Sequence, residues 1–455
     1  MKKLIALIMM LVMIASMSVA FAADVPTDIV SSGVLQYDAS KEVNGGNPVT
    51  LEFWVQTEMK DFYEKWCAAY TEIHPNVTFN ITLGSYEDHF TKLALALQAG
   101  NGPDLFHMHN TFTDQLMPNM KPYDQNVLPL DALREDFQLI DEHTYDGELY
   151  FMGMSINSCG MFYNKAHWAE AGLTDADIPQ TWSQFIEVAK KLTKYDETGK
   201  VVRAGFSYND MTMQYLIPTL ALQQNRAMFE KDSNVPIIDE QFVKNVIFLR
   251  DMYEVEKIGA MEFPMCALGF IEDTASIIYV GTWFGNWMRQ NAPGMEYGFF
   301  KTPLWDDNPN PAVVERCNSE STPGIAHYVS DEKYAAINDF LLYLLANDNA
   351  CLDFSLTNYN TPAKKCLSTH ELVLADPVLA ATGEMMDRLI FPGAVPDPYF
   401  TNLATYCWEG IMINGEDPVE AMEQYTEETT DMLDSTDFVS IESKYAHADE
   451  LNFDN

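Results

Sequence analysis

Aromatic side chains at the end of one predicted strand are the first residues of this chain that could contact a ligand. Trp283 comes shortly after the apolar strand 276–280, and Phe284 and Trp287 follow in the same segment. Because strand carboxyl ends border the crevice in open α/β sheets, a ring in this place can stack on the apolar face of a ligand. Packing into the core is the structural alternative for each ring. The pattern therefore predicts a ligand-stacking site around Trp283.

Polar side chains near two other predicted strands could supply hydrogen bonds to the same ligand. The candidates are Gln56, Thr57 and Glu58 after the strand 49–55, Tyr86 at the next helix start, and His107, Asn110 and Thr111 in and after the strand 105–108. Hydroxyl and amide groups donate and accept hydrogen bonds, as recognition of a hydroxyl-rich ligand requires. Asn110, at the strand exit, is the preferred hydrogen-bonding residue. Ordinary loop and turn chemistry is the structural alternative.

The histidine and cysteine patterns do not predict a metal site. His107 and His109 are two residues apart, which in a strand places both on one face, but no third ligand stands at a recognisable spacing. The seven cysteines are scattered and contain no CxxC pair. A single Cys351–Cys366 bridge and buried free thiols are both compatible with that spacing. No cofactor is expected.

Known catalytic motifs are absent from the sequence. It contains no Gly-x-Ser-x-Gly elbow, no His-Glu-x-x-His, no phosphate-binding glycine loop and no dinucleotide fingerprint. The 67 acidic residues make paired carboxylates common by chance, so their abundance does not indicate glycoside hydrolysis. We therefore expect a binding protein and no enzyme, with a secreted glycosidase as the alternative from another class.

The charge balance excludes several partners. Lys and Arg total 27 against 67 Asp and Glu, a formal net charge of −40, while 47% of the residues are hydrophobic. The apolar content is that of a folded protein, and 455 residues predict two or three lobes. Phosphates would be repelled over most of the surface, which excludes nucleic acid and disfavours phosphorylated ligands. The acidity is interpreted as a solvated outer surface.

The first residues have the pattern of an export signal. Two lysines precede an apolar run, and Ala20-Phe21-Ala22 supplies small residues at the two positions that a signal peptidase reads. The pattern predicts a signal peptide at 1–22, cleaved after Ala22, and a periplasmic or secreted protein. An uncleaved membrane anchor is the alternative. No cysteine lies near the cleavage site, so no lipid anchor is expected.

Hydrophobic periodicity predicts an α/β fold. A strand at 49–55, a helix at 59–73 and a strand at 77–83 form a βαβ unit, whose right-handed crossover predicts a parallel sheet. The next helix starts near 85 and should end at Gly100.

Helix caps and a polar stretch complete the expected organisation. Thr181 and Gln184 form a capping-box pattern at the start of a helix that reaches about 194. Ser330 precedes two carboxylates at the start of a long helix, which favours the helix dipole. The stretch 23–48 is rich in Ser, Gly, Asp and Asn and is interpreted as a flexible leader.

Four stretches, in order along the chain, carry a resemblance to a known family. They are Leu51-Glu52-Phe53-Trp54; Ala99-Gly100-Asn101-Gly102-Pro103-Asp104-Leu105; Asp146-Gly147-Glu148-Leu149-Tyr150 with Phe162-Tyr163-Asn164-Lys165 and Thr181-Trp182; and Gly281-Thr282-Trp283 with Thr322-Pro323-Gly324. Together they resemble the family-1 extracellular solute-binding proteins of ABC importers, whose best-known members bind maltose and related sugars.

The resemblance implies a two-lobed, type II periplasmic-binding-protein-like α/β fold with a ligand cleft between the lobes. The N-lobe would hold 48–155 plus 322–372, and the C-lobe 158–318 plus 373–455. The hinge residues would be Ser155, Ile156, Asn157 and Thr322.

The resemblance also implies a function. The chain would capture a sugar or oligosaccharide as a monomer and deliver it to the transmembrane subunits of an ABC permease, with Trp408 as a further aromatic platform. Asn110-Thr111 stand where sugar-binding members often have an Asp-Arg pair, so maltose specificity does not transfer. A polyamine or another small solute, held by aromatic rings and carboxylates such as Glu58 or Glu409, is the alternative ligand.

Overall fold

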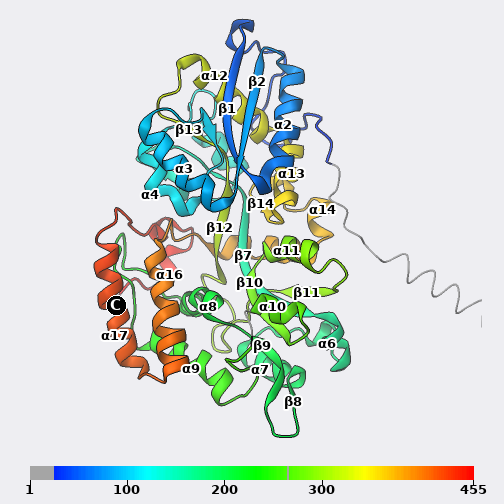
Figure 1. Ribbon diagram of the computed structural model, residues 1–455, viewed down its shortest axis with the longest axis vertical. Helices are drawn as coiled ribbons and strands as arrows, with labels where there is room; N and C mark the ends of the chain where they lie inside the picture. The colour runs from blue at the N-terminus through cyan, green and yellow to red at the C-terminus, as the bar shows by residue number, and fades with distance from the viewer. Residues whose placement is uncertain (1–24, 264–265, 455) are drawn as a thin grey trace, which may run out of the picture.

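Two α/β bodies lie one above the other along the long axis of the molecule, and a pair of strands connects them (Figure 1). The computed structural model describes residues 25–263 and 266–454, so the predicted signal peptide 1–22 lies outside the described residues. Within these ranges no helix has both the length and the apolar character needed to cross a membrane.

The upper body, which we call the N-lobe, is built on a five-stranded sheet. Its strand order is β2-β1-β3-β13-β4. The elements are β1 Val49–Gln56, α2 Lys60–Ile73, β2 Val77–Gly84, α3 Tyr86–Ala99, β3 Leu105–Phe106, β4 Met120–Lys121, α5 Leu130–Asp136, β13 Gly324–Ala326, α12 Asp331–Ala346 and α13 Asp348–Asn358.

The predicted βαβ unit is confirmed. Strand β1 pairs in parallel with β2 from Val49 opposite Val77 to Gln56 opposite Gly84. In β1 the apolar positions Leu51, Phe53 and Val55 are fully buried, while Thr50 and Glu52, before and between them, are exposed. Gly100 ends α3 in the left-handed conformation, at φ 67°, as its position after the apolar run predicts.

A single long strand passes from the N-lobe into the lower body, the C-lobe. Strand β7, Gly153–Asn164, has 12 residues and is flanked by β12, Glu315–Ser321, in its first half. Its second half pairs with β10, Ala275–Gly281, and β11, Tyr297–Phe300. The short strand β14, Thr361–Pro362, pairs with β7 at the crossing. The central sheet of the C-lobe is therefore continuous with the connection between the lobes (Figure 1).

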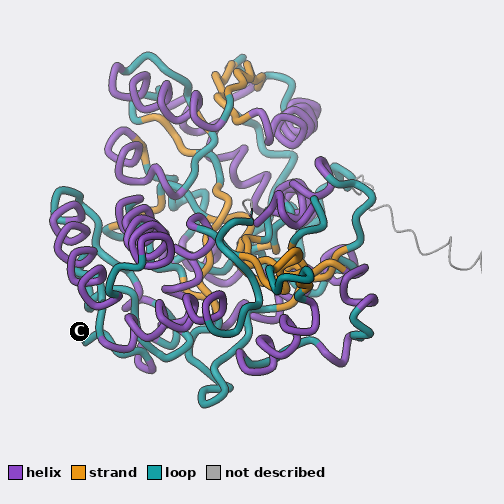
Figure 2. The backbone as a smooth tube through the Cα atoms, turned by 60° about the horizontal axis from the view of Figure 1, so that its bottom comes forward, coloured by secondary structure: helices purple, strands orange, loops and turns teal. Residues whose placement is uncertain are grey.

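Helices surround the C-lobe sheet, whose strands lie inside (Figure 2). Its further elements are α6 Lys165–Glu170, α7 Trp182–Leu192, β8 Lys194–Tyr195, β9 Val201–Ser207, α8 Asp210–Leu222, α9 Glu240–Glu254, α10 Cys266–Ile271, α11 Phe284–Asn291, α15 Pro377–Met385, β15 Leu389–Ile390, α16 Asp397–Leu403, the π-helix η9 Ala404–Asn414 and α17 Pro418–Leu433.

The capping residues predicted for α7 are in place, with one difference. Thr181 Oγ1 accepts a hydrogen bond from the Gln184 backbone N–H, as a capping box requires. The Gln184 side chain accepts from the backbone N–H of Gln180, one residue earlier than the box predicts.

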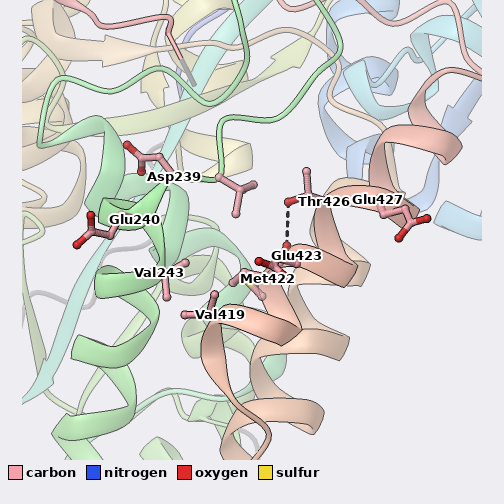
Figure 3. Close-up of a pocket in the computed structure, with 9 residues that line it drawn as sticks. Asp239, Glu240, Val243, Val419, Met422, Glu423, Thr426 and Glu427 are labelled. Carbon is pink, nitrogen blue, oxygen red and sulfur yellow. Dashed lines mark hydrogen bonds between the residues drawn. The ribbon is translucent and has the colours of Figure 1, made fainter.

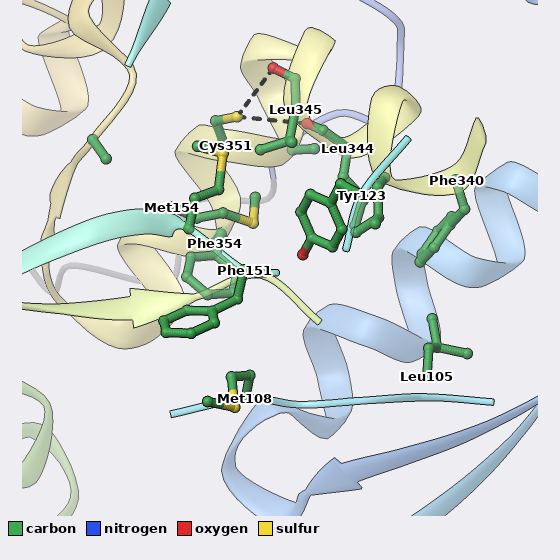
Figure 4. Packing of buried hydrophobic residues seen from close by; sticks show 14 of the residues in the cluster. Leu105, Met108, Tyr123, Phe151, Met154, Phe340, Leu344, Leu345, Cys351 and Phe354 are labelled. Atoms are coloured by element: carbon green, nitrogen blue, oxygen red, sulfur yellow. Dashed lines mark hydrogen bonds between the residues drawn. The ribbon is translucent and has the colours of Figure 1, made fainter. Parts of the chain in front are cut away.

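The lobes have separate hydrophobic cores. Residues 25–156 and 325–373 contribute most of the N-lobe core, in which Met154 of β7 lies near Phe354 and Cys351 of α13 (Figure 4). Residues 161–313 and 390–451 contribute most of the main C-lobe core. The clusters divide where the chain crosses between the bodies. The residue bounds predicted for the lobes stay a prediction.

The stretch interpreted as a flexible leader is instead packed on the N-lobe over its described part, 25–48. Leu35 and Val43 are buried, and the buried carboxylate of Asp136 accepts hydrogen bonds from the backbone N–H groups of Val34 and Leu35 at 2.7 and 2.8 Å. The composition predicted flexibility because the stretch is mostly polar, and its few apolar residues that pack on the N-lobe contribute little to that average. A carboxylate on a distant helix then satisfies the backbone donors, a pairing that only the folded chain provides.

All seven cysteines of the described chain are free thiols. Burial raises the pKa of Cys351, and Cys366 is exposed. The spacing of Cys351 and Cys366 allowed either a disulfide or free thiols, and in the structure both are free thiols.

Glu442 is a buried carboxylate that should make stability depend on pH. Its oxygens accept hydrogen bonds from the backbone N–H groups of Met228 and Phe229 and from Ser440 Oγ, yet burial raises its pKa to about 7. Because the folded-state pKa is above the usual carboxyl value, the native state binds the proton more tightly. Stability is then lost as pH rises from about 4.5 to 7, by roughly 3 kcal/mol.

We therefore expect Glu442→Gln to flatten this part of the pH profile. Urea unfolding at pH 5 and pH 8 should show the variant gaining stability, relative to the natural chain, at the higher pH. Parallel profiles for the two proteins would contradict the assignment.

Candidate functional site

A pocket lies between the two lobes, at the strands that connect them. It is lined by Asn110 and Thr111 after β3, Arg316 and Asn318 on β12, and Tyr215, Asp397 and Phe400 on helices α8 and α16. Its volume of about 90 Å³ is below the ~300 Å³ of the smallest common ligand sites. In this arrangement of the lobes the pocket is therefore smaller than a typical ligand site.

Arg316 supplies the positive charge of this pocket. Its guanidinium lies 4.4 Å from the Tyr215 ring centroid and 4.9 Å from that of Phe400, a cation–π contact with two rings whose own centroids are 5.0 Å apart. Within the described chain its side chain makes no ion pair, and its buried Nε has no hydrogen-bond partner. The arginine is thus held in place by aromatic rings with its donors unused.

The sequence patterns did not identify Arg316, Asn318, Tyr215 or Phe400 as site residues. They lie on β12, α8 and α16, far apart in the chain, and no motif links them. Half-buried residues alternate with buried ones along β12, but the buried Glu315, Ser319 and Ser321 are polar, so the sequence carries no apolar alternation that would have pointed to Arg316 and Asn318.

A second group of polar side chains adjoins the pocket on the N-lobe side. Tyr86 lies edge-on to His109 at 5.7 Å, and burial together with the Glu320 carboxylate raises the pKa of Tyr86 to about 12. Glu320 accepts a hydrogen bond from Asn157 Nδ2 at 3.4 Å, and its carboxylate is 4.0 Å from His109 Nε2. Neutral tyrosine and this carboxylate can together donate and accept hydrogen bonds.

Asn110 is at the pocket, but its amide is already used within the protein. Its Nδ2 donates to Asn318 Oδ1 at 2.6 Å and to Ser319 Oγ at 3.0 Å, and its Oδ1 accepts from Ser321 Oγ at 2.9 Å. His143 Nε2 lies 3.1 Å from the same Ser319 Oγ. Asn110 therefore anchors the loop after β3 to the connecting strand β12, which differs from its predicted use as a free ligand donor.

Asn110→Ala should remove a hydrogen-bond partner from three polar groups of β12, of which Ser319 Oγ and Ser321 Oγ are buried. We expect a loss of about 1–3 kcal/mol in the free energy of unfolding, measured by urea denaturation. Thr111→Ala is the matched control, because Thr111 is exposed and lies next to Asn110. Equal stability of the two variants would show that the Asn110 network contributes nothing.

The three predicted site residues at the end of β1 and just after it differ in burial and in hydrogen bonding. Gln56 is buried, and its Nε2 has no hydrogen-bond partner among the described residues. Thr57 is exposed and donates to the Gly84 carbonyl at 3.1 Å, and Glu58 is exposed. Gln56 is the one of the three whose buried donor is unused, and none lines the pocket described above.

Trp283 is an exposed indole beside the connection between the lobes. Its side chain is 43% exposed, and the neighbouring Thr282 hydrogen bonds to Ser158 on β7 and to Asn360 before β14. A Cβ on Gly281 would lie 2.4 Å from the indole Nε1, so glycine is needed for the ring to fold over it. The ring does not line the small pocket, and its exposed part faces solvent.

Several predicted ligand contacts are packing residues in the structure. Phe284 is fully buried in contact with Phe162 and Phe270, and Trp287 stacks on Phe284 at 5.3 Å. These placements correct the prediction for Phe284. The α11 helix turns its ring inward because the core of the C-lobe offers an apolar surface there.

His107 is also a correction. It is 1% exposed inside the N-lobe, beside the Tyr63 ring at 5.9 Å, and burial holds the pKa of its imidazole well below the usual value. Trp408, on the π-helix η9, is half-buried and lies edge-on to Tyr208 at 6.1 Å. Neither residue lines the pocket between the lobes.

The predicted hinge residues lie in the connecting strands. Ser155, Ile156 and Asn157 are opposite Glu320, Ser319 and Asn318 in the β7–β12 ladder. Thr322 follows β12 and hydrogen bonds to Tyr123 and to the backbone of Met152. Motion about these residues stays a prediction.

A serine, a histidine and an aspartate are hydrogen-bonded in the order of a hydrolase triad. Ser276 Oγ is 3.0 Å from His167 Nδ1, and His167 Nε2 is 2.7 Å from Asp273 Oδ1. Ser276 is 1% exposed in the middle of the C-lobe sheet. A nucleophile must reach a substrate carbonyl, so this group joins α6 to β10 and does not form an active site.

Within the described residues no cluster of three or more His, Cys, Asp or Glu side chains is arranged to hold a metal ion.

Comparison with known proteins places the chain in a family. The family model described as bacterial extracellular solute-binding protein matches residues 54–350. The chain is similar to an arabinooligosaccharide-binding protein of Halalkalibacterium halodurans, with 26% identity over 220 residues, 46% of this chain and 47% of that protein. It is also similar to a multiple sugar-binding protein of Streptococcus mutans, with 21% identity over 268 residues, 56% of this chain and 62% of that protein.

The chain thus spans about half to three fifths of the length of these curated relatives. Among solved structures, the cyclic alpha-maltosyl-1,6-maltose binding protein from Arthrobacter globiformis has a TM-score of 0.71 at 19% identity, covering 85% of this chain and 99% of the other. That likeness shows a shared type II periplasmic-binding-protein fold. The chain belongs to the bacterial extracellular solute-binding protein family.

Proposed function

We propose that this protein binds a sugar or oligosaccharide between its two lobes and delivers it to the permease of an ABC importer. The observation that carries the proposal is a pocket with walls from both lobes and a floor formed by the connecting strand β12. Such a ligand contacts both lobes at once and therefore favours the closed arrangement over the open one.

The chemistry of the pocket supports a hydroxyl-rich ligand. The rings of Tyr215 and Phe400 provide apolar surface, while Asn318, Thr111 and the unpaired Arg316 can form hydrogen bonds to hydroxyl groups. The sugar-binding names of the curated relatives support the same class of ligand. Arg316 disfavours a polyamine, because it would place two positive charges in one pocket.

The remaining expectations belong to the same proposal. The protein acts as a monomer that does not alter its ligand and does not bind nucleic acid. It is exported through a signal peptide cleaved after Ala22, without a lipid anchor, to the periplasm or the exterior. The family's description as extracellular supports export.

A ligand panel tests this function directly. We expect at least one of the arabino-, xylo- and malto-oligosaccharides to raise the melting temperature of the protein, because a ligand that binds only the native state stabilises that state. Calorimetry at low and high salt should give nearly equal affinities for a neutral sugar, whereas polyamine binding would weaken with salt. Stabilisation by polyamines alone, or release of cleaved sugar beyond one equivalent per protein, would overturn the proposal.

Arg316 should be a ligand contact in that experiment. Arg316→Met keeps an unbranched side chain beside the two rings but removes the guanidinium donors. We expect the affinity for the sugar identified above to fall by about ten- to a hundredfold, measured by calorimetry. Arg250→Met is the matched control, because Arg250 lies on α9 in ion pairs with Asp251 and Glu254. Equal affinities for both variants would remove Arg316 from the site.

A further inference from the structure

A second pocket, distinct from the one between the lobes, lies on the C-lobe between helices α9 and α17 (Figure 3). Its volume is about 570 Å³, which is in the range of ~300–1,000 Å³ for sites that hold ligands. It shares no lining residue with the interlobe pocket. We call it the α9–α17 groove.

The floor of the α9–α17 groove is apolar. Ile238 and Val243 line it from the start of α9, and Val419 and Met422 line it from α17, with Val243 and Val419 projecting into the gap between the helices (Figure 3). Val419 is 52% exposed, a large aliphatic side chain left open to water. Exposed apolar surface in a concave place is typical of interaction sites.

The rim of the groove is acidic. Of its four carboxylates, Asp239 caps α9 and pairs with Arg226, and Glu240 pairs with Lys244 at 2.8 Å. Glu423 and Glu427 make no ion pair within the described chain, although both line the groove. Helix α17 has no lysine or arginine in its 16 residues, so nothing on that helix neutralises them.

The charge of the rim and the apolar floor together restrict the occupant. A nucleic acid or an anionic lipid surface would be repelled by the unpaired carboxylates. A second copy of this chain would bring its own net charge of −40 to the same place. A partner that places aliphatic side chains on the floor and lysines or arginines opposite Glu423 and Glu427 satisfies both features.

We propose that the α9–α17 groove is a docking site for a basic amphipathic segment of a partner protein. Aliphatic side chains of the segment fill the space between Val243 and Val419, which removes that surface from water. Its cations face Glu423 and Glu427, which orients the segment and speeds its association. The site is independent of the sugar-binding proposal, because the two pockets have no residue in common.

The test uses the full chain and defined peptides followed by fluorescence anisotropy. A labelled helix-forming peptide with leucines on one face and lysines on the other is the probe. The matched peptides carry serine in place of leucine, or glutamate in place of lysine. We expect the Leu/Lys peptide to bind at least about tenfold more tightly than either.

Two charge reversals show where the peptide binds. Glu423→Lys/Glu427→Lys should weaken Leu/Lys binding by about tenfold or more. Glu64→Lys/Asp88→Lys makes the same change of charge at exposed positions on the N-lobe helices α2 and α3 and should have little effect. Val419→Ser, which keeps every charge, should also weaken binding. Melting temperatures of all variants confirm that each remains folded.

Three results would overturn the proposal. The Leu/Lys peptide could fail to bind at low salt, the two charge-reversal pairs could weaken binding equally, or the Ser/Lys peptide could bind as well as the Leu/Lys peptide. The last two outcomes mean general attraction of cations to an acidic protein. A fourth contradicting result would come from sedimentation. If the natural chain self-associates and Val419→Ser does not, the groove binds a second copy of this chain.

Discussion

The antiparallel pairing of β7 with β12 is the interaction on which the rest of the structure depends. Strand β7 belongs to the connection in its first half and to the C-lobe sheet in its second, so the two lobes share one continuous hydrogen-bonded ladder. Backbone groups in the ladder satisfy one another, which allows the connection to stay ordered without a large hydrophobic core of its own. Each lobe keeps a separate hydrophobic core, and the interlobe pocket lies beside the connecting strands.

The interlobe pocket follows from this arrangement. Strand β12 turns Arg316 and Asn318 toward the pocket and Glu315 and Ser319 toward the protein interior, because side chains alternate along a strand. Asn110 then joins the N-lobe loop to that strand through hydrogen bonds to Asn318, Ser319 and Ser321. The same strand that connects the lobes thus presents Arg316 and Asn318 to the pocket. Under the proposed function, a ligand that binds these side chains would lie directly at the connection between the lobes.

The interlobe pocket and the α9–α17 groove differ in chemistry. The interlobe pocket contains a guanidinium beside two aromatic rings, together with amide groups, a chemistry that suits the hydroxyl-rich ligand we propose. The α9–α17 groove is aliphatic with unpaired carboxylates, which suits a cationic amphipathic segment. The net charge of −40 acts on both, since it repels anionic competitors from the whole surface. Acidity therefore selects partners by exclusion, while local side chains provide recognition.

Local sequence alone determined the βαβ unit, the Gly100 helix end and the Thr181 cap, because each depends on residues that are neighbours in the chain. Ordered motifs also identified the family and its fold. Tertiary structure decided the rest. Phe284 and His107 lie near strand ends, where ligand contacts are expected, yet long-range packing buries both. The carboxylate of Asp136 accepts backbone hydrogen bonds from the stretch 25–48, which its composition predicted to be flexible. Arg316 and Phe400 meet only when β12 and α16 pack together. Periodicity reports which face of an element is apolar, but it carries no information about which distant element covers that face.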